Sequence, residues 1–310
     1  MKGYDTLIIT LPRDYERCRP LQEKLLSCLP GDKIYYVGNE GIKKLVEAGG
    51  LGERVGYILE DSVIPYDKVH GILCDIYQRN DVSRGITGWY YQQFLKMQYA
   101  RVCEKEYYLV WDGDTVPCKM FHMFHEEDKL PCFDLKTEYH KGYFDTLGRI
   151  LPGMQKCLKK SFISEHMLFS KKYMCELLDE IESNQALKGD TFYEKILYCM
   201  SQDEILESNF SEFETYGTYM TLRHPGEYKY RVWHSFRHGA TFFDPTTISE
   251  EDYAWMGRDF AAITFEKGDS LRDDTRNIFD NKRYQSMFTA RQVLEIAQEE
   301  FEDGYIEVWD

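Results

Sequence analysis

Two aspartates, Asp112 and Asp114, lie in the segment Trp111 to Val116, at the end of the apolar run Tyr107 to Val110, which predicts a buried β-strand. Only Gly113 separates them, so two carboxylates stand where the strand meets solvent. The two carboxylates repel each other, and this repulsion costs stability unless a cation or several hydrogen-bond donors compensate for it. This is the only Asp-x-Asp in the chain. We therefore expect the strand end to hold Mn²⁺ or Mg²⁺, which prefer oxygen ligands and can bridge the two phosphates of a nucleotide diphosphate.

Within this motif, we expect Asp114 to bind the metal directly and Asp112 to act through water or the ribose. A simple charged turn is the alternative interpretation. Phosphatases with an aspartate nucleophile also carry Asp-x-Asp, followed by one residue and then Thr. Here Thr115 follows Asp114 at once and the motif is not on the first strand, so the sequence argues against that class.

The composition narrows the function classes. A chain of 310 residues with 43% hydrophobic residues can bury a large core. A net charge of −15 disfavours binding to DNA or RNA. No apolar run approaches the roughly 20 residues of a membrane-spanning helix, and we expect no signal peptide. The nine cysteines include no Cys-x-x-Cys pair, which indicates reduced thiols rather than a zinc site or a disulfide framework.

The order of predicted elements indicates an α/β protein with a parallel sheet and crossover helices. In the first half we predict strands at 5–11, 33–37, 54–59, 107–110, 116–120 and 132–135. Helices are predicted at 14–29, in a short stretch after 39 and at 89–100, with loop and short helix over 60–84. In the second half we predict strands at 162–169, 228–233 and 261–265, and helices at 171–184, 191–208, 212–222 and 283–301.

No repeat, low-complexity tract or Pro/Ser-rich linker interrupts the chain, which favours one compact domain, residues 1–310. Within it we expect a nucleotide-sugar-binding half over about 1–150, an acceptor-binding half over about 151–270 and a helical extension over about 271–310.

Four segments resemble a family of bacterial glycosyltransferase-like proteins that is linked to surface-polysaccharide genes. These segments are 88–96, 107–116, 162–169 and 209–217, and the resemblance spans roughly residues 5 to 265. It implies a GT-A fold, in which a Rossmann-like nucleotide-binding sheet with flanking helices joins a more helical acceptor-binding half. It specifies neither the donor nor the acceptor sugar.

The resemblance also assigns roles by position. The loop after the first strand would cradle base and ribose, and Arg13 would meet the diphosphate or nearby surface carboxylates. Helix residues Gln92 and Lys96 share a face and could reach the donor, or simply be solvated. Glu165 and His166 would lie on the donor-sugar and acceptor side, although a lone histidine in an apolar stretch also suits a core. The expected nucleotide-binding residues are Thr10, Pro12, Arg13, Tyr36, Gly38, Asn39, Gln92, Lys96, Asp112, Gly113 and His166, and ordinary turn chemistry is the alternative for Thr10 and Gly38.

An inverting transferase needs a carboxylate that takes the proton of the acceptor hydroxyl. Glu212 and Glu214 are candidates, although acidic residues after the N-cap Ser211 also suit a first helical turn. Asp203 competes for the role, with Gln202 and Glu204 beside it.

A late histidine is expected as a further metal ligand, and His234 is the choice over His238 because it follows a strand-like run. Arg231 or Arg237 could neutralise phosphate. A basic surface loop is the alternative for this segment.

The sequence thus predicts a metal-dependent glycosyltransferase that moves a sugar from a nucleotide diphosphate donor, with a UDP-sugar as first choice, to a glycan hydroxyl in capsule, exopolysaccharide or lipopolysaccharide synthesis. The alternatives are a metal-dependent phosphohydrolase and a non-catalytic nucleotide- or sugar-binding protein on the same fold. The expected partners are a nucleotide sugar and a free or lipid-linked glycan, and the expected location is the cytoplasm, with peripheral contact at the inner face of the membrane. Stereochemistry, linkage and oligomeric state are left open.

Overall fold

The computed structural model describes residues 3–271, 279 and 281–298. The chain forms two compact units, each assembled from three separate segments. Unit 1 comprises Met1–Ile9, Gly31–Trp111 and Phe124–Arg231, and unit 2 comprises Thr10–Pro30, Asp112–Met123 and Val232–Asp310. Residue 150, the expected division between two halves, lies within unit 1.

Unit 1 is built on a five-stranded sheet with the order β3-β2-β1-β4-β7. Its first four strands are parallel, and β7 runs antiparallel to β4. The central strands read as nearly continuous apolar runs because helices cover a parallel sheet on both faces. The expected α/β class is confirmed. The strands are β1 (Tyr4–Ile9), β2 (Ile34–Gly38), β3 (Val55–Leu59), β4 (Tyr107–Trp111) and β7 (His166–Ser170).

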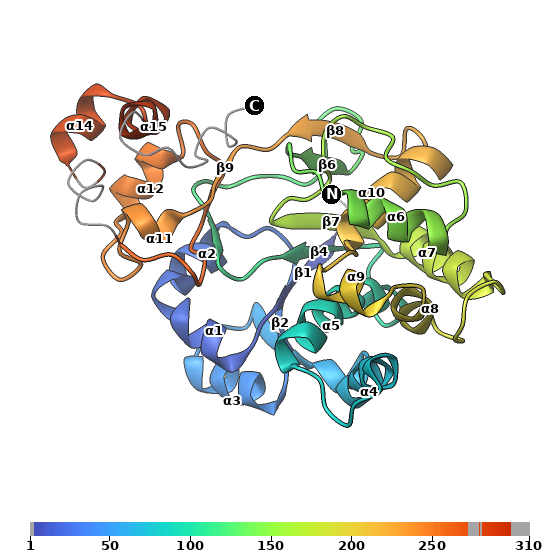
Figure 1. The fold of residues 1–310 in the computed structure, drawn as a ribbon. Coiled ribbons are helices and arrows are strands. Elements are labelled where there is room, and N and C mark those ends of the chain that lie inside the picture. The colour runs from blue at the N-terminus through green and yellow to red at the C-terminus, as the bar shows by residue number, and fades with distance from the viewer. Residues whose placement is uncertain (1–2, 272–278, 280, 299–310) are drawn as a thin grey trace. The chain divides into compact units, whose positions relative to one another are not determined.

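Helices flank this sheet in two groups. Helix α3 packs against β2 and β3, while α4 packs against α5 and α8, and α8 packs against α7 (Figure 1). A two-stranded sheet of β6 (Cys132–Leu135) and β8 (Lys229–Val232) completes the unit. The α-helices are α3 (Glu40–Gly49), α4 (Tyr66–Tyr77), α5 (Arg84–Gln98), α6 (Lys141–Ile150), α7 (Lys171–Ser183), α8 (Phe192–Tyr198), α9 (Gln202–Leu206) and α10 (Glu212–Arg223).

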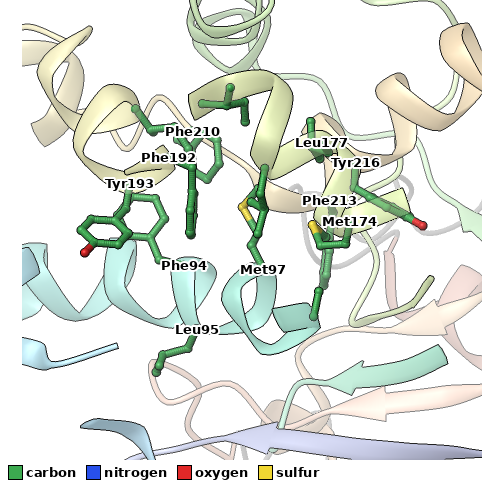
Figure 2. Packing of buried hydrophobic residues seen from close by; sticks show 14 of the residues in the cluster. Phe94, Leu95, Met97, Met174, Leu177, Phe192, Tyr193, Phe210, Phe213 and Tyr216 are labelled. Carbon is green, nitrogen blue, oxygen red and sulfur yellow. The ribbon is translucent and has the colours of Figure 1, made fainter. Parts of the chain in front are cut away.

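Aromatic side chains form the centre of the unit 1 core. Phe94 of α5 lies against Phe192 and Phe210, with ring centroids 5.8 Å apart in both pairs. Figure 2 shows these rings with Tyr193 and Met97 between the helices. Edge and tilted ring contacts of this kind add to the free energy of burial. The core therefore fixes α5 and the start of α10, which carry several candidate site residues.

Unit 2 contains a three-stranded sheet with the order β5-β10-β9. Its core is a second aromatic cluster that includes Phe236, Phe242, Trp255 and Phe260. The strands are β5 (Thr115–Pro117), β9 (Ser235–Phe236) and β10 (Ala262–Thr264). The helices are α1 (Pro12–Arg17), α2 (Gln22–Cys28), α11 (Gly239–Phe242), α12 (Glu250–Met256), α14 (Lys282–Met287) and α15 (Ala290–Gln298).

Three predicted helices are each broken in two. Pro20 lies in a short 3-10 turn that separates α1 from α2, because proline supplies no backbone N–H and clashes with a preceding helical turn. Ser201 and Glu204 form a capping box that starts α9 within the predicted helix 191–208. Thr289 and Gln292 exchange hydrogen bonds at the start of α15, which separates it from α14. Residues 299–301 of the last predicted helix lie outside the described residues.

Other boundaries also differ from the prediction. Helix α4 has 12 residues where loop and short helix were expected, and α6, α11 and α12 were not predicted. The strand predicted at 162–169 begins only at His166. All nine cysteines are free thiols. Among the described residues, no helix combines the length and apolarity needed to cross a bilayer.

Candidate functional site

The Asp-x-Asp segment begins at the switch point of the parallel sheet. Strands β2 and β3, which follow β1 in the chain, lie on one side of β1, and β4 lies on its other side. The direction in which strands are added to the sheet therefore changes between β1 and β4. Ligands of open α/β sheets bind outside the carboxyl ends of the strands at such a point. Strand β4 ends at Trp111, and Asp112 follows directly. The predicted strand is confirmed, with one more residue at its end, and the Asp-x-Asp motif follows its carboxyl end.

Within unit 2, backbone hydrogen bonds fix the two aspartates in a turn. The Thr115 amide donates to the carbonyl of Asp112 at 3.1 Å, and the Phe265 amide donates to the carbonyl of Asp114 at 2.8 Å. The buried Thr115 and Thr264 hydroxyls are 2.8 Å apart. Asp114 is therefore anchored to the end of β10.

The charges around Asp114 are unbalanced. Burial and the neighbouring charge of Asp112 raise the pKa of Asp114 to about 6, Arg17 opposes this rise, and Glu266 adds to it. A guanidinium nitrogen of Arg17 lies 3.5 Å from Asp114 Oδ2, and another donates to the Phe265 carbonyl. A cation bound here would favour the ionised form of Asp114.

Arg17, which the sequence analysis did not select, is the arginine beside Asp114. The Arg13 side chain is largely exposed and lies 3.5 Å from Asp14, so it has the surface partner that was the alternative interpretation. Pro12 opens α1, and the Thr10 hydroxyl donates to the carbonyl of Leu11. The sequence analysis did not select Arg17 because it expected a helix from Asp14 to Leu29, whereas α1 begins at Pro12 and ends at Arg17.

The register of the unit 2 sheet separates Asp114 from His234. The carbonyl of His234 accepts a hydrogen bond from Ala261, whereas Asp114 is bonded to Phe265. Four residues of strand correspond to roughly 13 Å at about 3.3 Å per residue. His238 comes after β9 on the Asp114 side, because Phe236 pairs with Ile263 and the chain continues toward Thr264. The register therefore favours His238 over His234 as the imidazole nearer Asp114.

Other charged groups follow β9 and β10 on that side. Arg237 donates to Glu266 at 2.7 Å, and His238 Nδ1 lies 3.2 Å from Asp269. Within the part of the chain that the structure describes, no three His, Cys, Asp or Glu side chains form a group that could hold a metal ion. The donor set of Asp112 and Asp114 instead fits Mg²⁺ or Mn²⁺ sites of the kind in which one or two carboxylates bind the cation and substrate phosphates and water complete its shell.

In unit 1, two predicted site residues bind each other. Lys96 Nζ lies 2.8 Å from Glu212 Oε1, and both side chains are almost fully buried. The Lys96 ammonium also lies 4.6 Å from the centre of the Phe213 ring. Gln93, which the sequence did not single out, accepts a hydrogen bond from the Glu212 amide, while Gln92 is half-exposed.

Glu214 lies two residues after Glu212 and has a different environment. Its Oε1 accepts hydrogen bonds from the Ser161 hydroxyl at 2.6 Å and the Phe162 amide at 3.3 Å. Burial raises the pKa of Glu214, although the Ser161 hydrogen bond and the charge of Lys156 oppose the rise. Asp203 is exposed in the first turn of α9. Glu214 is thus the only one of the three predicted base candidates that is buried without a lysine or arginine bonded to it in the described structure.

His166 belongs to a buried charged group that the sequence did not predict. Its Nε2 lies 2.8 Å from Asp134 Oδ2, and Arg231 Nη2 donates to the same oxygen at 2.9 Å. Burial raises the pKa of Asp134, but the hydrogen bonds from Arg231 and His166 outweigh it and hold the pKa below its ordinary value. The Trp111 ring stacks on His166 at 4.8 Å. The sequence signal that could have revealed this group is Asp134, a single aspartate in the apolar predicted strand 132–135. A buried charge normally has a partner, so such a residue predicts a paired group.

The remaining predicted residues have structural partners. Glu165 pairs with Lys136 at 2.7 Å. Tyr36 and Gly38 are buried in β2. Asn39 caps α3 by accepting a hydrogen bond from the Gly41 amide at 2.9 Å, which is the ordinary use of asparagine before a helix.

These features define an α/β protein with an acidic site after a central strand. Residues 53–280 match DUF6492, a family of unknown function, and the chain belongs to this family. No curated protein resembles the sequence closely enough to match it.

Comparison with solved structures gives partial similarities to two sugar transferases. The chain is similar to apo mouse xyloside xylosyltransferase 1, with 12% identity, a TM-score of 0.44, and coverage of 87% of this chain and 100% of that one. It is also similar to the galactosyltransferase LgtC in complex with donor and acceptor sugar analogues, with 12% identity, a TM-score of 0.42, and coverage of 92% and 96% respectively.

Proposed function

We propose that this protein is a glycosyltransferase of the GT-A type that uses a divalent cation and a nucleotide diphosphate sugar. The observation that carries the proposal is the position of Asp112-Gly113-Asp114 directly after β4, at the switch point of a parallel sheet. A pair of carboxylates there suits a cation that is shared with a diphosphate. Burial and the charge of Asp112 raise the pKa of Asp114, and a bound cation would favour its ionised form, which supports this proposal.

Asp114 and Asp112 would hold Mn²⁺ or Mg²⁺, with His238 as a closer imidazole than His234. When bound, the cation would supply positive charge to the leaving diphosphate. Arg17 holds the Asp114 turn through its bonds to Asp114 and Phe265. It would add a second positive charge beside a bound diphosphate.

Glu214 is the proposed base if the reaction inverts. One of its oxygens is oriented by Ser161 and Phe162, and its raised pKa brings it closer to neutrality, where a base is most effective. Glu212 is engaged by Lys96 and therefore has a positioning role at the start of α10. The acceptor is a glycan hydroxyl, free or lipid-linked.

The test is thermal unfolding with UDP and other nucleoside diphosphates, with and without Mn²⁺. Ligand at a hundred times its Kd stabilises a protein by about 2.7 kcal/mol, so a metal-dependent shift is expected for one nucleotide. Asp114→Asn should abolish the shift, and Glu251→Gln, a change at an exposed carboxylate of α12, should not. No shift with any nucleotide in Mn²⁺ would refute the proposal. Phosphate release from an aryl phosphate that Asp112→Ala abolishes would indicate a phosphohydrolase instead, and binding without turnover across donors and acceptors would indicate a binding protein.

A further inference from the structure

A cysteine and a histidine lie in direct contact on one face of α4 in unit 1. Cys74 follows His70 by four residues, a spacing that places two side chains next to each other on a helix. The Sγ atom of Cys74 lies 3.5 Å from Nε2 of His70. Cys74 is half-buried and the His70 side chain is 21% exposed, so the pair lies at the protein surface. A thiol beside an imidazole is an arrangement in which a general base activates a nucleophile.

The partners of the His70 ring determine which of its nitrogens can accept a proton. Nδ1 lies 3.0 Å from the hydroxyl oxygen of Thr87 in α5, and that hydroxyl donates to the Ser83 carbonyl at 3.5 Å. The Thr87 oxygen therefore accepts from Nδ1–H, which assigns the proton of the neutral ring to Nδ1. Nε2 then has the lone pair that accepts the S–H proton of Cys74. The stacked Tyr66 ring and the packing of α4 against α5 hold the imidazole in this position (Figure 1).

Asp81 supplies a negative charge for the protonated ring. Its Oδ1 atom lies 3.2 Å from the same Nε2 atom of His70, and its side chain is 86% exposed. Transfer of the thiol proton to Nε2 gives an imidazolium whose N–H faces both this carboxylate and the Cys74 sulfur. An opposite charge at this distance favours the charged form, although solvent screens a partner that is so exposed. Asp81 therefore adds a modest stabilisation to the pair of thiolate and imidazolium.

The other half-buried thiols have environments that favour the protonated form. Burial raises the pKa of Cys157 and Cys175, and it raises that of Cys199 to about 11. Cys175 and Cys199 also donate to backbone carbonyl oxygens, which cannot take up a proton. Because the thiolate is the attacking species, these three thiols are weak nucleophiles at neutral pH. Within the described structure, Cys74 is the one half-buried cysteine with an imidazole at hydrogen-bond distance.

We propose that Cys74 is a modification site, a nucleophilic thiol with His70 as its base, which forms a mixed disulfide with a low-molecular-weight disulfide such as oxidised glutathione. His70 Nε2 takes the thiol proton, and the thiolate attacks one sulfur of the small disulfide. The S–S bond of that molecule breaks as the new S–S bond forms, and the released thiolate takes the proton from the imidazolium. Cys74 is oxidised and the leaving sulfur is reduced to a thiol, so the exchange needs no further reactant. It uses neither the cation nor the nucleotide of the proposed transferase.

The experiment incubates the reduced full-length protein with oxidised glutathione at neutral pH and follows the adduct at each cysteine by peptide mass spectrometry. Cys74 should react at least about tenfold faster than every other cysteine. His70→Gln should slow the reaction at Cys74 at least about tenfold, since a positioned base contributes about 10²–10⁴-fold. The matched control is His125→Gln, at a histidine that pairs with Asp128, and it should leave the rate at Cys74 unchanged. Faster modification of any other cysteine in wild type would overturn the proposal.

The rates at Cys175 and Cys199 separate the loss of a base from a loosened fold. Loss of the base slows Cys74 and leaves these two rates as in wild type, whereas a loosened fold makes both of them react faster. An unchanged rate at Cys74 in His70→Gln, with the other two also unchanged, would overturn the role of the imidazole. If His70→Gln loosens the fold, Thr87→Val is the deciding variant, because it keeps the shape of the side chain and removes the hydroxyl that orients the ring. It should slow Cys74, and an unchanged rate there would overturn the proposal.

Discussion

The Nζ atom of Lys96 lies 2.8 Å from Oε1 of Glu212, and both side chains are almost completely buried in unit 1. This ion pair joins α5 to the first turn of α10, and Gln93 reinforces it by accepting a hydrogen bond from the Glu212 amide. Each residue alone resembles a ligand-binding group. Together they orient the helix that carries Glu214.

Lys96→Met should lower the free energy of unfolding by about 3–5 kcal/mol, because it leaves the Glu212 carboxylate buried and unpaired. The double variant Lys96→Met with Glu212→Gln should recover much of this loss, since no buried charge remains. Urea unfolding at neutral pH measures both. Lys105→Met, which breaks an exposed pair with Asp32, is the control and should change stability little. Equal losses in the single and double variants would show that the carboxylate is not the source of the instability.

Glu214→Gln should lower kcat by about 10²–10⁴ if the glutamate acts as base, because the amide cannot accept the acceptor proton. Since the base works ionised and the pKa of Glu214 is raised, the wild-type rate should rise with pH through a pKa above the ordinary glutamate value. Asp203→Asn, at an exposed carboxylate of α9, should leave kcat unchanged. A small loss in kcat with a higher acceptor KM would instead indicate a retaining enzyme in which Glu214 only binds the acceptor.

Asp114 makes the metal-free protein less stable as pH rises. Its pKa is raised to about 6 from an ordinary value of 3.8. Between these two pH values the folded state binds more protons than the unfolded state. The free energy of unfolding therefore falls as the pH rises across this window. Asp114→Asn should therefore be more stable than wild type above pH 6, and the difference should vanish below pH 4. We expect about 1–3 kcal/mol, since one pKa unit corresponds to about 1.4 kcal/mol, with the lower part of this range favoured because the side chain is 30% exposed. Thermal and urea unfolding in chelator from pH 4 to 8 measure this, and a variant less stable than wild type at pH 7 would contradict it.

The strands of the parallel sheet were predictable because β1, β2 and β4 are mostly buried apolar runs and β3 is a half-buried one. The unit 2 sheet was harder, since β5 and β10 have three residues each and β9 two, which is too short for a periodic signal. Two helix breaks did have local signals, Pro20 and the Ser201–Glu204 capping box, and both were overlooked.

In the candidate site, too, some residue positions follow from local sequence and others depend on tertiary contacts. The position of Asp112 and Asp114 after β4 was predictable because it depends only on where that strand ends. The pairing of Asp134 with His166 and Arg231 joins residues 32 and 97 positions apart, and no local pattern encodes it. The preference for His238 over His234 depends on the parallel register of β9 with β10, which is fixed by tertiary packing.

Gly217 of α10 tests how tightly this helix is packed beside Glu214. In an exposed helix, Gly→Ala stabilises a protein by about 1 kcal/mol. A Cβ atom at Gly217 would lie 2.2–2.5 Å from ring atoms of the buried Phe162, so Gly217→Ala should instead destabilise by about 1–3 kcal/mol. Gly71→Ala, in α4 with no atom within 4 Å of its Cβ, is the matched control and should be neutral or stabilising. Combining Gly217→Ala with Phe162→Ala, which removes the Cγ and Cδ atoms of the ring, should relieve the clash and cost less than the two single changes together. Urea unfolding of wild type, the two single variants and the double variant decides the case, and additive losses would place the cause elsewhere than the ring contact.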